Sequence, residues 1–477
     1  VLAREQSGSP VERYVSLHVH LPADGVLVVL HADARAWLPA LAKRCADATV
    51  FATHRRLPVV QALQRDLDLL GATNVTVLHA QGTSALPDAL AADVVVIRLP
   101  TEKIGFQQLL FDAVHCLRDG GSCLVYGGTN EGIKTAARTM QSVFGQARVL
   151  AHGGGHRVLA ATLTAALDTA GRDALAAPYH DASVFLESMV TLRGATIPVS
   201  TRPGVFSWEH LDEASAVLAG VMEIPRAASV LDLGCGSGVL GAVAGVLSDG
   251  GAVTLVDADS EAVRCATRTM QSTGITSWRV LASDVTSAVQ GESFDVVLCN
   301  PPFHTGKATD LALPIRFIEE AYSVIRSGGR LMLVANRTLP YEQEFELAAD
   351  GYSAAVTASY YRGRYVFVFG EASSHARHDD IATDFRKYAG RNIAVLRKSP
   401  PRDEDYRPYF DAVEYKSFDV AGARFHVVLG RGFNYVNYRD RVLAKVRDRY
   451  YRMPGYLPRG HCDFCERYFE GASCPVR

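Results

Sequence analysis

The segment Asn300-Pro301-Pro302-Phe303 combines residue types that can hold a flat amino group. It follows the apolar run 294–298, which predicts a buried strand. Two consecutive prolines remove two backbone donors and keep the chain extended, so the Pro301 carbonyl can face a ligand instead of a neighbouring strand. The Asn300 amide oxygen and this carbonyl can both accept hydrogen bonds from a planar NH2, and Phe303 can stack on a flat ring. Taken alone, the pattern also fits an Asn-Pro turn that closes a strand.

A glycine-rich turn precedes this segment in the chain. In VLDLGCGSGVLG (230–241), a predicted strand runs directly into Gly234, Gly236 and Gly238 and then into a predicted helix. Glycines allow a sharp turn and a close approach of the backbone to a ligand. The motif lacks the Gly-Lys-Ser/Thr continuation of a phosphate-binding loop, so a nucleoside without phosphates fits it better.

Two acidic residues end the next two predicted strands of the same unit. Asp257 ends the strand 252–257, where a carboxylate can accept hydrogen bonds from both hydroxyls of a ribose. Asp284 follows the strand 279–282, where a carboxylate can accept from an adenine amino group. The glycine turn and the two acids therefore predict a nucleoside site, and the structural alternative is a tight turn followed by helix N-caps.

Together these motifs resemble the class I S-adenosylmethionine-dependent methyltransferases. The segment 300–303 resembles the NPP(F/Y) loop of their amino-methylating members, which implies that it turns the lone pair of the amine towards the methyl group. The segments GVFSWEHLDEAS (204–215) and VANRTLPYE (334–342) sharpen the resemblance to ribosomal RNA guanine-N2 methyltransferases of the RsmC/RlmG type, which carry a methyltransferase small domain. The resemblance covers roughly residues 20–370.

The resemblance implies that S-adenosylmethionine is the cofactor and that N2 of a guanine in ribosomal RNA or a ribosomal subunit is the acceptor. Catalysis is expected from Asn300, Pro301, Pro302 and Phe303. The expected cofactor-binding residues are Asp232, Gly234, Cys235, Gly236, Gly238, Asp257, Asp284, Asn300 and Phe206. A target base must be unstacked before it is methylated, and the expected base contacts are Phe303, His304 and Lys307. The last two fit a solvated loop equally well.

A degenerate internal repeat predicts an α/β fold with two tandem Rossmann-like units, 1–195 and 196–372. DVVVIRLPTEK (93–103) aligns with DVVLCNPPFHTGK (295–307), and VLVVLHADA (26–34) aligns with VLDLGCGSG (230–238). The first unit lacks the glycines and the asparagine of the second. We therefore expect it to bind no cofactor and to contribute to structure and RNA docking.

Residues 379–477 differ in composition and predict a small C-terminal accessory domain rich in aromatic residues and arginine. His461, Cys462, Cys465 and Cys474 have the elements of a Cys3His zinc site. However, adjacent residues rarely bind the same ion, so free thiols and a disulfide or cluster remain alternatives. Residues 431–456 interleave aromatics with arginines, which suits stacking on single-stranded RNA or packing of a helix on the main body.

Composition limits the class of protein. The 477 residues are 48% hydrophobic with a net charge of −2, so no global basic field indicates nucleic-acid binding. No long apolar run predicts a membrane span, the N-terminus is unlike a secretory signal, and the scattered cysteines suit a reduced, cytoplasmic protein. The near-neutral charge leaves a small-molecule N-methyltransferase as an alternative. A non-catalytic RNA-binding scaffold is disfavoured by the intact Asp257, Asp284 and Asn300.

Overall fold

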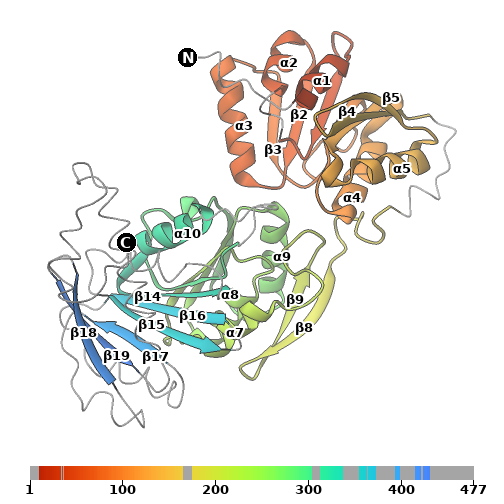
Figure 1. The fold of residues 1–477 in the computed structure, drawn as a ribbon. Coiled ribbons are helices and arrows are strands. Elements are labelled where there is room, and N and C mark those ends of the chain that lie inside the picture. Colours follow the sequence, from red (N-terminus) through yellow and green to blue (C-terminus); the bar gives the residue numbers. More distant parts are fainter. Residues whose placement is uncertain are drawn as a thin grey trace, which may run out of the picture.

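The fold is a pair of α/β units along the chain, drawn in red to orange and in yellow to cyan in Figure 1. The computed structural model describes residues 10–33, 35, 37–164, 175–302, 312–336, 354–361, 364–371, 393–397, 414–420 and 423–429. In the strands from residue 354 onwards it describes the backbone. The α/β class and the Rossmann-like fold predicted from the sequence are confirmed.

The first unit contains a sheet of order β3-β2-β1-β4-β5-β7-β6, whose first five strands run parallel and whose last two pair antiparallel. Its elements are α1 (Pro10–His18), β1 (Val26–Leu30), α2 (Leu38–Arg44), β2 (Thr49–His54), α3 (Leu57–Leu70), β3 (Val75–His79), β4 (Ala92–Arg98), α4 (Lys103–Cys116), β5 (Leu117–Gly128), the 3-10 turn Thr129–Glu131, α5 (Ile133–Phe144), β6 (Arg148–Gly153) and β7 (His156–Thr162).

The second unit begins with a hairpin and repeats the same sheet order, β12-β11-β10-β13-β14-β16-β15. Its elements are β8 (Leu186–Leu192), β9 (Ala195–Thr201), α7 (Glu213–Val221), β10 (Ser229–Leu233), α8 (Val239–Ser248), β11 (Ala252–Asp257), α9 (Ser260–Gln271), β12 (Trp278–Ala282), the 3-10 turn Ser287–Val289, β13 (Phe294–Cys299), α10 (Ala312–Ser323), β14 (Ile325–Asn336), β15 (Ala354–Tyr361) and β16 (Arg364–Glu371). The identical strand order gives a structural counterpart to the degenerate sequence repeat.

Three further strands extend the second sheet beyond β15. They are β17 (Ile393–Arg397), β18 (Glu414–Val420) and β19 (Ala423–Leu429). β17 pairs antiparallel with β15, and β19 lies between β17 and β18. The described part of the region predicted as an accessory domain thus continues the sheet of the second unit. The domain boundaries themselves remain predictions.

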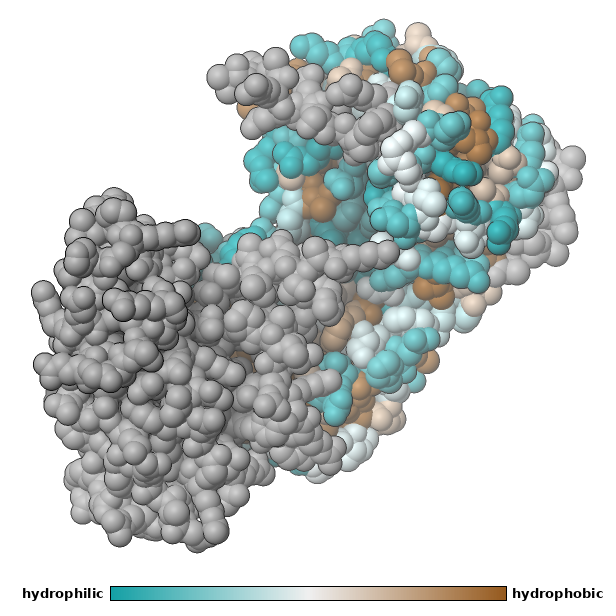
Figure 2. All heavy atoms as spheres, viewed as in Figure 1, coloured by the Kyte–Doolittle hydropathy of each residue, from teal (hydrophilic) through white to brown (hydrophobic). Residues whose placement is uncertain are grey.

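Each central strand buries both of its faces, as expected for parallel strands covered by helices. In β1, Val28 and Leu30 join one core with α4 and α5, and the alternating Leu27 and Val29 join another with α2 and α3. Figure 2 shows hydrophilic side chains over much of the visible surface of the first unit, with apolar ones in small separate groups. Within the described part of the chain, no helix is both long and apolar enough to cross a bilayer.

Candidate active site

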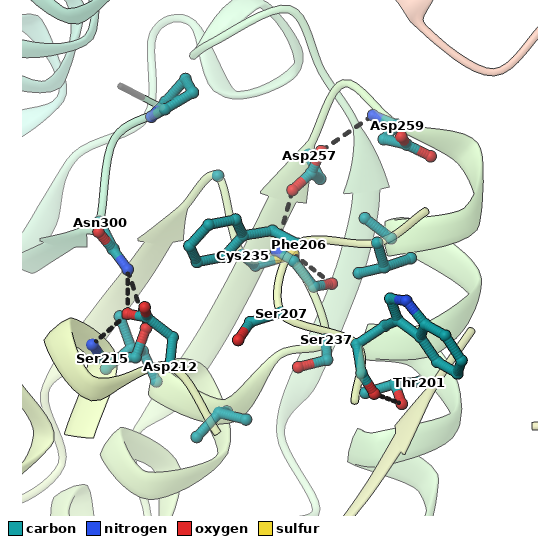
Figure 3. Close-up of a pocket in the computed structure, with 18 of the residues that line it drawn as sticks. Thr201, Phe206, Ser207, Asp212, Ser215, Cys235, Ser237, Asp257, Asp259 and Asn300 are labelled. Carbon is teal, nitrogen blue, oxygen red and sulfur yellow. Dashed lines mark hydrogen bonds between the residues drawn. The ribbon is translucent and has the colours of Figure 1, made fainter. Parts of the chain in front are cut away.

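A cavity of about 770 Å³ lies where the carboxyl ends of β10, β11 and β13 meet (Figure 3). A site at the carboxyl ends of the strands is the usual ligand position in open α/β sheets. The glycine turn, the segment 204–212 and the β8–β9 hairpin form most of the described wall. The first unit contributes to the same wall, through Arg56, Pro58 and Glu102.

The glycine turn adopts the conformation for which its glycines are needed. Gly234, Gly236 and Gly238 all have positive φ, at 74°, 53° and 83°. A Cβ on Gly238 would also lie 3.2 Å from Ala266 of α9, closer than ordinary contact. The turn therefore requires glycine for its backbone angles and, at Gly238, for close packing of the helix.

Asp257 joins the glycine turn to the next strand end. Its Oδ2 accepts from the Gly236 amide at 2.9 Å, and its Oδ1 accepts from the Asp259 amide at 2.9 Å (Figure 3). Burial, together with the nearby Asp259 carboxylate, raises the pKa of Asp257 to about 6. Asp257 thus lines the cavity and is partly protected from water, and its predicted contact with a ribose remains a prediction.

Several of the other predicted cofactor residues line the cavity. Asp284, Cys235 and Phe206 line the cavity with Gly234 and Gly236, whereas Gly238 is not among its described lining residues. Arg316 donates to Asp284 at 2.9 Å, and burial raises the pKa of the Cys235 thiol well above its ordinary value, so the thiol is neutral. Phe206 is 64% exposed at the cavity.

Asp232 is not among the described residues that line the cavity. It is 1% exposed, and its Oδ2 accepts from the Gly241 amide of α8 at 2.7 Å. Burial raises the pKa of Asp232 to about 7. We therefore expect Asp232 to act on a ligand through the shape of the glycine turn, since its carboxylate supports the start of α8.

Asn300 is held by its amide nitrogen and leaves its amide oxygen without a partner. Nδ2 donates to Asp212 Oδ2 at 3.0 Å and to Ser215 Oγ at 2.9 Å (Figure 3). Because an ionised carboxylate only accepts hydrogen bonds, Asp212 fixes which end of the amide faces it. Oδ1 is buried and has no hydrogen-bond partner among the described residues. A buried acceptor without a partner is costly, so this atom is poised to accept from a ligand.

Asp212 and Ser215 were given no role by sequence reasoning, although they belong to the segment GVFSWEHLDEAS. Asp212 is the N-cap of α7, and its Oδ2 also accepts from the Ser215 amide at 2.8 Å. An aspartate directly before a predicted helix is an N-cap signal. It does not reveal the second contact with Asn300, which is 88 residues away.

Pro301 and Pro302 line the cavity beside Asn300, as expected. Phe303, His304 and Lys307 lie outside the described residues, and so do His461, Cys462, Cys465 and Cys474. Their predicted roles at the base and at a zinc ion remain predictions. Among the described residues, no group of three or more His, Cys, Asp or Glu side chains could hold a metal ion.

Comparison with known proteins places this geometry in a family. Residues 196–362 match the family model for the methyltransferase small domain. A ribosomal RNA small subunit methyltransferase C from Yersinia enterocolitica is 33% identical over 267 residues, covering 54% of this chain and 70% of the relative. The chain belongs to the ribosomal RNA small subunit methyltransferase C family. The resemblance predicted from the sequence motifs is thereby confirmed.

Other members of the methyltransferase C family match a shorter stretch. The protein from Sodalis glossinidius is 39% identical over 164 residues, and the match spans 45% of its length. A solved structure, the T. thermophilus 16S rRNA N2 G1207 methyltransferase (RsmC) in complex with AdoMet and guanosine, aligns at a TM-score of 0.64 and 25% identity. This alignment covers 77% of this chain and 93% of that chain, so the likeness extends beyond a single unit.

Proposed function

We propose that the protein transfers a methyl group from S-adenosylmethionine to N2 of a guanine in small-subunit ribosomal RNA. The observation that carries this proposal is the Asn300 amide. Its nitrogen donates to Asp212 and Ser215, and its oxygen is a buried acceptor with no partner among the described residues, at the cavity that holds the glycine turn.

The residues at the cavity fit S-adenosylmethionine. The described lining carries six carboxylates and, from lysine and arginine, one positive charge, Arg56. The carboxylates are Glu102, Glu209, Asp212, Asp257, Asp259 and Asp284. An acid-rich cavity suits a ligand that carries a sulfonium and an ammonium group. Asp257 would hold the ribose hydroxyls and Asp284 the adenine amino group, and the bound cofactor supplies a methyl group activated by the sulfonium.

The chain would then act mainly by positioning the acceptor amine. Asn300 Oδ1 and the Pro301 carbonyl can accept the two N–H bonds of the guanine amine, which turns the lone pair out of conjugation and towards the methyl group. Holding the reacting atoms in line supplies a large part of the rate gain. No strong base is needed before the attack, because the proton leaves once the nitrogen has become cationic.

The substrate is taken from the relatives and from the predicted base contacts. The T. thermophilus relative is titled as a 16S rRNA N2 G1207 methyltransferase in complex with AdoMet and guanosine. By analogy, Phe303 would stack on an unstacked guanine here, and His304 and Lys307 would contact its edge or a phosphate. Since ribosomal RNA is the proposed substrate, we place the protein in the cytoplasm with the ribosomal subunit as its partner.

Labelled S-adenosylmethionine tests this function directly. Purified protein is incubated with small and large ribosomal subunits, with deproteinised ribosomal RNA, and with small amino compounds. We expect label in small-subunit RNA. Label in small molecules alone would support the alternative that the net charge of −2 favours, a small-molecule N-methyltransferase, and would overturn the proposed substrate.

A further inference from the structure

The first unit is joined to the cofactor side of the second unit by strand-like backbone pairing. Residues 55–58, which run from the end of β2 into the first turn of α3, lie against residues 258–260, which run from the end of β11 to the first residue of α9. The Leu57 amide donates to the Ala258 carbonyl at 2.8 Å, and the Ser260 amide donates to the Arg55 carbonyl at 2.8 Å. An antiparallel bridge pairs Arg56 with Asp259. Two units that are distant in sequence thus share a short ladder.

A partly buried ion pair reinforces this ladder. Arg55 Nε donates to Asp259 Oδ2 at 2.6 Å, and the two side chains are 11% and 23% exposed. His79 of β3 adds a ring nitrogen that lies 2.7 Å from the Arg55 carbonyl and 3.0 Å from the Ala258 carbonyl. An ion pair shielded from water is screened less than a surface pair, so its geometry is held more firmly.

Asp259 connects the ion pair with Arg55 to Asp257, the predicted ribose-binding residue. Its amide donates to Asp257 Oδ1 at 2.9 Å, the contact drawn in Figure 3, and its Oδ1 accepts from the Glu261 amide as the N-cap of α9. The other oxygen of Asp257 is bound by Gly236. The Asp257 carboxylate therefore accepts one hydrogen bond from the glycine turn and one from Asp259, the residue that pairs with Arg55.

We propose that Arg55 of the first unit is a positioning residue for the cofactor site, which sets cofactor affinity through Asp259 and the orientation of Asp257. The first unit then has a role beyond the structural support and RNA docking expected from its sequence. This inference rests on the cofactor half of the proposed function and is independent of which RNA is methylated.

The test compares Arg55→Ala with Arg35→Ala. Arg35 belongs to the same unit and pairs with Asp66 at 2.5 Å, but its side chain is 54% exposed and it does not line the cavity. Binding of S-adenosylhomocysteine is measured by calorimetry, and kcat and the KM for RNA are measured at saturating cofactor. For Arg55→Ala we expect a Kd raised about tenfold, with kcat and the KM for RNA within about twofold of wild type. Arg35→Ala should bind as wild type does.

A second variant keeps the test decisive if Arg55→Ala does not fold. Asp259→Asn removes the charge that pairs with Arg55 but keeps an oxygen that can cap α9. It should raise the Kd by at least the same factor, because it also removes one of the carboxylates that line the cavity. Where both variants fold, the double variant should bind the cofactor product no more weakly than Asp259→Asn does. Arg55→Ala then removes only the ion pair that Asp259→Asn has already broken. A wild-type Kd in the variants, or a loss confined to kcat or to the KM for RNA, overturns the proposal. Failure of the wild-type protein to bind S-adenosylhomocysteine would instead contradict the proposed function.

Discussion

Asn300 and Asp212 lie 88 residues apart in the chain and meet at 3.0 Å beside the cavity. Asp212 performs two tasks with one oxygen, because Oδ2 also caps α7 through the Ser215 amide. The start of α7 and the orientation of the Asn300 amide are therefore coupled. This coupling links the segment before the glycine turn to the loop that follows β13.

Replacing Asn300 should separate catalysis from cofactor binding. Asn300→Ala removes the orphaned acceptor, and we expect kcat to fall by about 100-fold to 1,000-fold, the loss typical of one preorganised hydrogen-bonding group. The Kd for S-adenosylhomocysteine should change less than about threefold. Single-turnover methyl transfer and calorimetry measure the two quantities, and an equal loss in both would contradict the role assigned to Asn300.

Replacing Asp212 should affect both stability and rate. Asp212→Ala removes the N-cap of α7, which costs about 1 kcal/mol of unfolding free energy, and it frees the Asn300 amide to rotate. We expect kcat to fall at least about tenfold. Asp212→Asn keeps an oxygen for the cap and should retain most of the stability while still lowering kcat. Thermal unfolding and initial rates distinguish the two effects; a variant with a normal kcat would show that Asp212 only caps the helix.

Cofactor affinity should fall at acidic pH. The pKa of Asp257 is raised to about 6, mainly by burial, and the ionised carboxylate is the form that accepts two ribose hydroxyls. As pH falls through about 6 the carboxyl becomes protonated, so the Kd for S-adenosylhomocysteine should rise below that pH and stay flat above about pH 7. Calorimetry across this range checks the prediction. Asp257→Asn should bind weakly and with a flatter pH profile; an unchanged profile would assign the titration to another group.

The segment 179–184, which precedes β8, is bound by a buried guanidinium, that of Arg202. Arg202 is 3% exposed and donates to Glu261 at 2.8 Å and to the carbonyls of Tyr179 and Asp181 at 2.8 and 2.9 Å. Arg202→Ala leaves Glu261 buried with Arg264 as its remaining cation. Breaking a buried pair costs about 3–5 kcal/mol of unfolding free energy.

Urea unfolding measures this cost, with an exposed pair as the control. The side chains of Arg279 and Glu292 are 46% and 40% exposed, so Arg279→Ala should cost less than about 1 kcal/mol. Equal losses in the two variants would show that the Arg202 network adds no more than a surface contact does.

Local sequence signals predicted the strand ends and the glycine turn that meet at the cavity. The strand predicted directly before the glycine turn, the strand predicted at 252–257 and the strand predicted from the apolar run 294–298 correspond to β10, β11 and β13, and the glycine turn lies where the motif places it. These features depend on residues adjacent in sequence, so periodicity and glycine spacing reveal them.

Long-range contacts were not predictable in the same way. The hydrogen bond between Asp212 and Asn300 and the ion pair between Arg55 and Asp259 join segments whose local patterns show only an N-cap and two charged turns. Likewise, strand periodicity cannot show that β17 pairs with β15. The partner of a strand is decided by packing across the whole sheet.

The measurement that tests the central claim most directly is the identity of the methylated atom. Small-subunit RNA methylated in vitro with labelled S-adenosylmethionine is digested to nucleosides, which are separated and analysed by mass spectrometry. The Asn300 geometry predicts methylation of an exocyclic amine and the relatives point to guanine, so the label should elute as N2-methylguanosine and be lost in Asn300→Ala. Label in a nucleoside methylated at a ring nitrogen, a carbon or a ribose oxygen would contradict the account, because those positions offer no planar amine for Asn300 and Pro301 to hold.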